Sequence, residues 1–335
     1  MTSVEYVNIK QKEALKFKDA WNLTTNDIDK DKIYEVLDKE LPNYDKDLLD
    51  SVITSDNHQQ ALEDFATSLF NDIKLFTENK YVKLYSVTGL GFIRRGTIEA
   101  GCISVDDFGK PFDNKGYSIL INIGLYYAAN ILVKSIIIEN FQNDLEKYKS
   151  NGDYLLNSAL KIYLKHDDTV IESMKFNEFP VEIRNDLNII QSNNSVRLLQ
   201  FVALHEFGHI VNGDLGIMNL YHDSLVNKQI ETDNVIYQKE YKADIFALEH
   251  ILKKDKNPLS MWGSFYTISY FFIWVWGLEK ILKRKISNIH PNPIDRVWNL
   301  YNYMLKHIKD EHNYKELINQ AIERIDKWTK NYNLS

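Results

Sequence analysis

The sequence predicts an α+β fold that is mainly helical and carries a small antiparallel sheet. Over most of the chain, apolar residues recur at spacings of three and four with charged residues between them, which is the helical pattern. Residues 81–122 differ, because short runs of β-branched and aromatic residues alternate there with glycines, as in strands joined by turns. The chain has 335 residues, of which 44% are hydrophobic, so it is long enough to bury a core.

Three regions are expected along the chain. They are an N-terminal helical region (1–80), a small sheet with helices (81–185), and a helical region that carries the candidate site and forms one compact unit with the sheet (186–335). The apolar spacing of the first region is set by Leu62, Phe65, Leu69, Ile73, Leu75 and Phe76.

Three segments are candidates for strands. They are YVKLYSVTG from Tyr81, GTIEAGCISV from Gly96 and GYSILINIG from Gly116. Residues 125–141 are then expected to be helical, and Pro180 is expected to break any helix that reaches it.

Residues 258–278 (PLSMWGSFYTISYFFIWVWGL) carry no charge over a length that could span a bilayer. Serine, threonine and tyrosine recur within this segment, and its aromatic residues are spread along it instead of gathering at its two ends. This composition favours a buried core helix, with a membrane-associated helix as the alternative.

The composition limits which binding partners and which cellular compartment are expected. The formal net charge is −7 and no long block of like charge occurs, so a nucleic-acid partner is not expected. Cys102 is the one cysteine, which excludes an intrachain disulfide and favours a reducing compartment. The first residues lack the apolar run of a secretory leader, and we therefore expect a cytoplasmic protein.

The pentapeptide HEFGH carries the chemistry. His205 and His209 are four residues apart, so on a helix both imidazoles project from one face and can bind a single metal ion, typically Zn²⁺. Glu206 is then placed to take a proton from a water molecule that zinc activates, which makes it the candidate general base. The alternative is an ordinary pair of helical histidines, one in the core and one on the surface.

The motif lies in an apolar helical run over residues 196–211. The preceding SNNS at 192–195 favours a helix N-cap, and Asn212 with Gly213 suits a C-cap. We therefore expect a helix bounded by these two signals.

A hydrolytic zinc site needs a third protein ligand, and Glu240 in EYKAD is the candidate. Asp244 lies four residues later on the same helical face and is placed to orient a ligand histidine, while Ala243 is small enough to let the two helices approach. A solvated Glu–Asp face is one alternative, and His222 as the third ligand is another.

HEFGH followed by EYKAD (ExxAD) resembles the gluzincin metallopeptidases, especially the CAAX prenyl protease and HtpX group. IHPNPIDRV is similar to the HPxxxxR stretch of that group. The resemblance covers residues 195–298 and implies a zincin-like fold with bound Zn²⁺. It implies these roles: His205, His209 and Glu240 as ligands, Glu206 as base, Asp244 and Arg296 as supporting residues, and His290 as a group near the substrate that contacts the oxyanion or donates a proton.

The chain departs from the membrane peptidases of that group between residues 211 and 239, where it is polar and they carry hydrophobic spans. In size and organisation it is also similar to the phage-exclusion protease Lit and related cytosolic HExxH proteins.

The sequence thus predicts a zinc metalloendopeptidase that hydrolyses peptide bonds of a protein or peptide substrate, with a membrane contact not expected. An extended substrate is expected to add a strand to the sheet, and GYSILINIG is the candidate edge. Two alternatives stay open, namely a non-catalytic zinc-containing protein-binding or regulatory module and a membrane-associated peptidase.

Overall fold

The computed structural model describes residues 3–14, 55–77, 81–93, 95–104, 116–140, 152–165, 170, 175–176, 179–215, 230–255, 257–286 and 290–332. Its helices are α1 (Ser3–Ala14), α4 (Ser55–Phe76), α5 (Val82–Tyr85), α6 (Ile123–Asn140), α8 (Gly152–Lys165), α9 (Val181–Asn212), α11 (Ile230–Lys254), α12 (Pro258–Leu282), α13 (Pro293–His307) and α14 (Tyr314–Asn331). Its strands are β1 (Thr88–Ile93), β2 (Ala100–Ser104) and β3 (Tyr117–Asn122). The predicted mainly helical α+β architecture is confirmed.

The described strands form one mixed sheet with the order β1-β3-β2. β2 runs antiparallel to β3, with Ala100 opposite Ile121, whereas β1 runs parallel to β3, with Thr88 opposite Tyr117. The prediction of a purely antiparallel sheet is therefore wrong for the β1–β3 pair. The apolar pattern of a strand shows which face is buried, but it does not encode the direction of the neighbouring strand.

The strand β3 is central, which also corrects the candidate substrate edge. GYSILINIG supplies β3, whose two sides are taken by β1 and β2. Its side chains Ile119 and Ile121 are fully buried. A continuous apolar run is what a strand buried on both faces requires, so this pattern favours a central strand over an edge.

The first strand candidate is only partly a strand. Residues 82–85 form the single helical turn α5, and β1 begins at Thr88. Tyr85 is buried and stacks on Phe207 of α9, with the ring centroids 5.2 Å apart. A tertiary contact thus overrides the β propensity of this aromatic segment.

The N-terminal region is helical where the structure describes it, in α1 and α4, while residues 15–54 lie outside the described residues. Leu69 and Ile73 of α4 are buried, as the helical spacing predicts. Leu75 is 79% exposed, because it falls on the opposite side of the helix.

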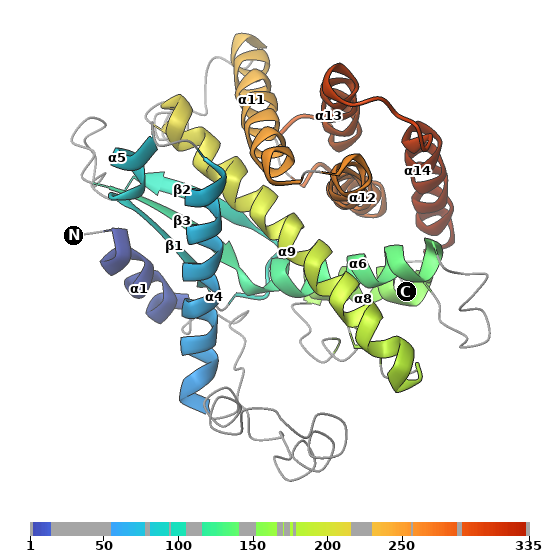
Figure 1. The fold of residues 1–335 in the computed structure, drawn as a ribbon, viewed down its shortest axis with the longest axis horizontal. Helices are drawn as coiled ribbons and strands as arrows, with labels where there is room; N and C mark the ends of the chain where they lie inside the picture. Colours follow the sequence, from blue (N-terminus) through green and yellow to red (C-terminus); the bar gives the residue numbers. More distant parts are fainter. Residues whose placement is uncertain are drawn as a thin grey trace.

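Helix α9 is the long central element (Figure 1), and it packs against α11, α6, α12, α4, β2 and β3. It begins directly after Pro180, so the predicted N-cap at SNNS is wrong. In this upstream part Gln191 donates a hydrogen bond of 2.9 Å to the backbone carbonyl of Asn130 in α6, and Ser195 is buried. The predicted C-terminal boundary is confirmed, because Gly213 has a φ of 70° and ends the helix in the left-handed conformation.

Helix α12 contains the long uncharged segment, and its burial confirms the predicted core helix. Trp262, Tyr270 and Trp274 are among its largest buried side chains. It packs against α13, α14, α9 and α6. Within the described residues, no helix combines the length and the apolar character needed to cross a membrane.

We expect Gly277→Ala to lower the free energy of unfolding by about 1–3 kcal/mol, because added core volume must push packed neighbours apart. A Cβ atom on Gly277 of α12 would lie 2.5 Å from Cγ2 of Ile325 and 3.3 Å from Trp328 in α14. The matched control is Gly263→Ala in the same helix, where a Cβ atom would meet nothing within 4 Å. Urea denaturation should show that this control is unchanged or stabilised by up to about 1 kcal/mol; equal destabilisation of both variants would contradict the packing account.

Candidate metal centre

The candidate site forms where α9 crosses α11 at small residues. A Cβ atom on Gly208 would lie 3.3 Å from Cα of Ala243 and 3.2 Å from the ring of Phe246. Ala243 is itself fully buried. This crossing brings the HEFGH face of α9 against the EYKAD face of α11.

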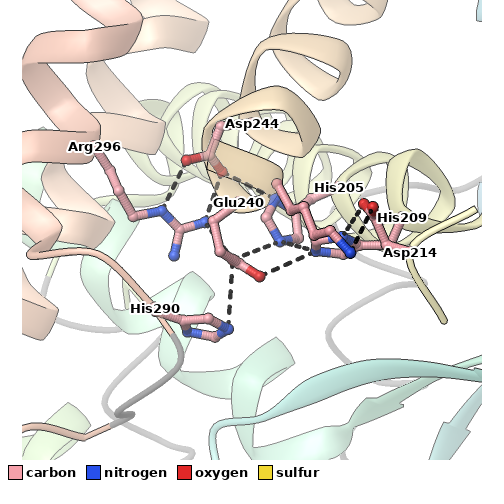
Figure 2. Close-up of polar contacts among 8 residues, drawn as sticks. His205, His209, Asp214, Glu240, Asp244, His290 and Arg296 are labelled. Atoms are coloured by element: carbon pink, nitrogen blue, oxygen red, sulfur yellow. Dashed lines mark hydrogen bonds and ion pairs between the residues drawn. The ribbon is translucent and has the colours of Figure 1, made fainter. Parts of the chain in front are cut away.

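His205 and His209 lie one turn apart on α9, and Glu240 of α11 faces both of them (Figure 2). The two Nε2 atoms are 3.2 Å apart. Oε2 of Glu240 lies 3.4 Å from His205 Nε2, and Oε1 lies 3.3 Å from His209 Nε2. All three side chains are buried, so two imidazole nitrogens and one carboxylate converge in the interior. His222, the alternative ligand, lies outside the described residues.

Each histidine contacts an aspartate through its other ring nitrogen. His209 Nδ1 forms a 3.0 Å hydrogen bond with Oδ2 of Asp214. His205 Nδ1 lies 2.9 Å from Oδ1 of Asp244, a hydrogen-bonding distance without the directional geometry of a hydrogen bond. With the Nδ1 atoms turned to these carboxylates, both Nε2 atoms face Glu240.

Arg296 of α13 completes the His205 side of the site. Its Nε donates to Oδ2 of Asp244 at 2.8 Å, and its Nη2 donates to Oδ1 at 2.6 Å. The guanidinium carbon lies 4.2 Å from the ring centroid of Phe272. This two-pronged pair compensates a fully buried carboxylate and fixes its orientation.

His290 approaches the same carboxylate from the segment before α13. Its Nε2 lies 3.5 Å from Oε2 of Glu240, and Figure 2 shows it on the side of Glu240 away from His209. The His290 side chain is 42% exposed, compared with 1% for Glu240. The structure therefore places His290 at the solvent-facing side of the cluster.

Glu206 follows His205 on α9, is partly exposed, and its charge acts on His209 and His290. It is outside the group of converging metal-ligand atoms found among the described residues. Cys102 of β2 lies near enough to Glu206 for the carboxylate to act on its thiol. Burial, and then the Glu206 charge, raise the pKa of Cys102 well above its usual range, so this cysteine stays a thiol.

Three residues near the site have no counterpart in the sequence prediction, namely Cys102, Asp214 and Lys239. Nζ of Lys239 lies 3.5 Å from Oδ1 of Asp214. The sequence does contain a signal for Asp214, because this residue directly follows the C-cap glycine in HEFGHIVNGD. A turn at such a glycine brings the chain back toward the end of the helix. The pairing of Cys102 with Glu206 depends on the sheet packing and leaves no local sequence signal.

The charges of the cluster are strongly coupled. Burial opposes ionisation of Glu240, but His290, His205 and His209 outweigh it and hold the pKa of Glu240 well below its usual range. Burial also opposes protonation of His209, yet hydrogen bonding to Asp214 and Glu240 raises its pKa to about 10. A metal ion that binds to these nitrogens would therefore have to displace the protons that the neighbouring carboxylates favour there.

The residues fit a zinc ion on the chemistry of their donors. Two imidazole Nε2 atoms and a glutamate oxygen are a ligand set typical of catalytic zinc. The three residues offer ligand atoms that all lie within 4.8 Å of one another. Oε2 of Glu240 is buried and makes no hydrogen bond among the described residues, so it keeps an acceptor position for a cation.

Comparison with known proteins identifies one family. A family model described as Peptidase U49, a Lit-like peptidase family, matches residues 141–331, which is more than half of the chain. The matched part contains α8 to α14 with all the converging donors and leaves out the sheet. Searches of curated proteins and of solved structures gave no match.

In the metal-free protein we expect protonated His209 to stabilise the fold. Its pKa rises from 6.5 to about 10 on folding, so this stabilisation is complete below pH 6.5 and is lost as the pH rises toward 10. In the presence of a chelator, the free energy of unfolding should fall over this range by at least about 1 kcal/mol more in the wild type than in His209→Gln. His307→Gln on α13 is the control and should behave as the wild type; equal slopes for all three proteins would contradict the assignment.

Proposed function

The chain belongs to the peptidase U49 family, and from this premise we propose that it is a zinc-dependent metalloendopeptidase of the gluzincin type. The observation that carries the proposal is the convergence of two imidazole Nε2 atoms on the buried Glu240 carboxylate at the crossing of α9 and α11. A protein or peptide is the substrate class. The single cysteine supports a cytoplasmic location.

His205, His209 and Glu240 would hold the zinc ion, with Asp244 and Arg296 orienting His205. Bound zinc would supply a Lewis acid for the scissile carbonyl and would lower the pKa of a water molecule toward neutrality. With three protein ligands, such a centre keeps one position open for water or substrate, as a catalytic site requires.

Glu206 is the proposed general base. It follows His205 directly, its charge acts on His209 and His290, and it is itself outside the ligand cluster. Its carboxylate would accept a proton from the attacking water as the new C–O bond forms. It would then give that proton to the amine nitrogen as the C–N bond breaks, so one residue serves as base and as acid.

His290 is the proposed donor to the carbonyl oxygen on which negative charge develops. It lies at the solvent-facing side of Glu240, where a substrate would enter. Desolvation of the part of the His290 ring that faces the cluster is the main cause that lowers its pKa, against the opposing charge of Glu240, and this favours a neutral ring that can donate one N–H.

The strand β2 is the proposed docking edge for an extended substrate. Among the described strands β2 pairs with β3 alone, and it packs against α9. The Glu206 charge acts on Cys102 at the centre of β2, which supports a course of the strand near the proposed base. A peptide added along the side of β2 away from β3 would gain main-chain hydrogen bonds and carry its backbone past the site.

Glu206→Gln should retain zinc and reduce hydrolysis by about a hundredfold or more, because the variant keeps the shape of the side chain and loses its basicity. The measurement counts new peptide N-termini in an amine-blocked, proteome-derived peptide library after incubation with the zinc-loaded protein. Glu249→Gln in α11 makes the same charge change at a surface ion pair with Lys253 and should leave cleavage unchanged.

Glu240→Ala provides the converse comparison, since it should lower the zinc content per chain as well as the cleavage. Undiminished cleavage by Glu206→Gln would contradict the role of the base. Undiminished zinc content in Glu240→Ala would contradict the third ligand.

A further inference from the structure

The turn after α9 places a carboxylate behind His209. Gly213 adopts a φ of 70°, and the backbone N–H of Asp214 then donates to the carbonyl of His209 at 3.0 Å. This reversal directs the Asp214 side chain back along the helix, where its Oδ2 meets His209 Nδ1 at 3.0 Å. Asp214 is buried, although it lies outside the helix.

The contact defines the orientation of the imidazole. A carboxylate at Nδ1 favours the tautomer that carries its proton there and presents the Nε2 lone pair on the opposite side of the ring. That Nε2 atom lies 3.3 Å from Glu240 Oε1 and 3.2 Å from His205 Nε2. Asp214 therefore acts on the ring atom opposite the one that would bind metal.

A buried cation lies beside the second oxygen of Asp214. Nζ of Lys239, the residue before Glu240, is 3.5 Å from Asp214 Oδ1. This ammonium group is buried and makes no hydrogen bond among the described residues. Because a buried carboxylate without a partner is costly, the neighbouring ammonium group offsets part of the cost of burying the Asp214 side chain.

The arrangement repeats on the other ligand histidine. There Arg296 bonds both oxygens of Asp244, and Oδ1 of Asp244 lies 2.9 Å from His205 Nδ1. Each histidine thus has an aspartate behind it, and each aspartate has a cation behind it. Lys239 holds its aspartate less firmly than Arg296 does, because the lysine makes one contact with the carboxylate and the arginine makes two.

We propose that Asp214 and Lys239 are positioning residues for His209, with Lys239 holding the Asp214 carboxylate and the carboxylate fixing the ring for metal binding. The inference rests on the proposed function, which makes His209 a zinc ligand. A capping role alone would need only the backbone of Asp214, because its N–H makes the bond that ends the helix. The side chain is therefore the part whose removal tests the proposal.

The experiment measures the zinc affinity of the full-length chain by competition with a chromophoric chelator, together with the visible absorption spectrum of the Co²⁺-substituted protein. Asp214→Ala should weaken zinc binding about 10–100-fold, the usual effect of removing such a partner. Asp214→Asn, which keeps the size and one acceptor, should weaken it less. Lys239→Met should weaken zinc binding, whereas Lys239→Arg should bind zinc about as well as the wild type does.

The matched control is Lys242→Met, which removes an exposed lysine from the same helix and should bind zinc as the wild type does. Wild-type zinc affinity and unchanged Co²⁺ spectra in Asp214→Asn and Lys239→Met would overturn the positioning role and leave the proposed function standing. Absence of zinc binding by the wild type would instead overturn the proposed function, and this inference with it. Urea denaturation of each variant identifies any variant that fails to fold. If Asp214→Ala or Lys239→Met does not fold, the zinc affinities of Asp214→Asn and Lys239→Arg test the positioning role instead.

Discussion

The close crossing of α9 and α11 is the constraint on which the site depends. Gly208 and Ala243 let the two helix backbones approach, and an added Cβ atom at Gly208 would already lie 3.3 Å from Cα of Ala243. His205 lies three residues before Gly208 and His209 directly after it, and Glu240 lies three residues before Ala243. A larger residue at the crossing would move the donor atoms apart, and metal coordination is sensitive to such shifts.

That crossing also buries charge, and the surrounding residues compensate it. Glu240, Asp244 and Asp214 are buried carboxylates within one small region. Arg296 and Lys239 lie against the two aspartates. In the metal-free protein the histidine protons compensate Glu240, whereas a bound dication would do so in their place. Structure and chemistry are thus coupled, since the groups that stabilise the metal-free site are the groups that would bind the metal.

Much of this site follows from spacing within helices, which the sequence displays directly. HEFGH and EYKAD are periodic motifs, so the shared helical face of His205 with His209, and that of Glu240 with Asp244, are predictable. The meeting of these two faces depends on the close crossing at Gly208 and Ala243. Asp214 is different, because its position depends on the left-handed turn at Gly213. The start of α9 could not be predicted for another reason. Tertiary hydrogen bonds such as that of Gln191 to α6 stabilise the helix across residues that by themselves favour an N-cap. The parallel pairing of β1 with β3 is a property of two strands, and neither strand's pattern contains it.

X-ray absorption spectroscopy of the zinc-loaded protein tests the central claim most directly, because it identifies the atoms bound to the metal. We expect one shell of nitrogen and oxygen at about 2.0–2.1 Å, with the outer scattering of two imidazoles and no sulfur. A sulfur shell at about 2.3 Å, or the scattering of three imidazoles, would contradict the ligand set of His205, His209 and Glu240.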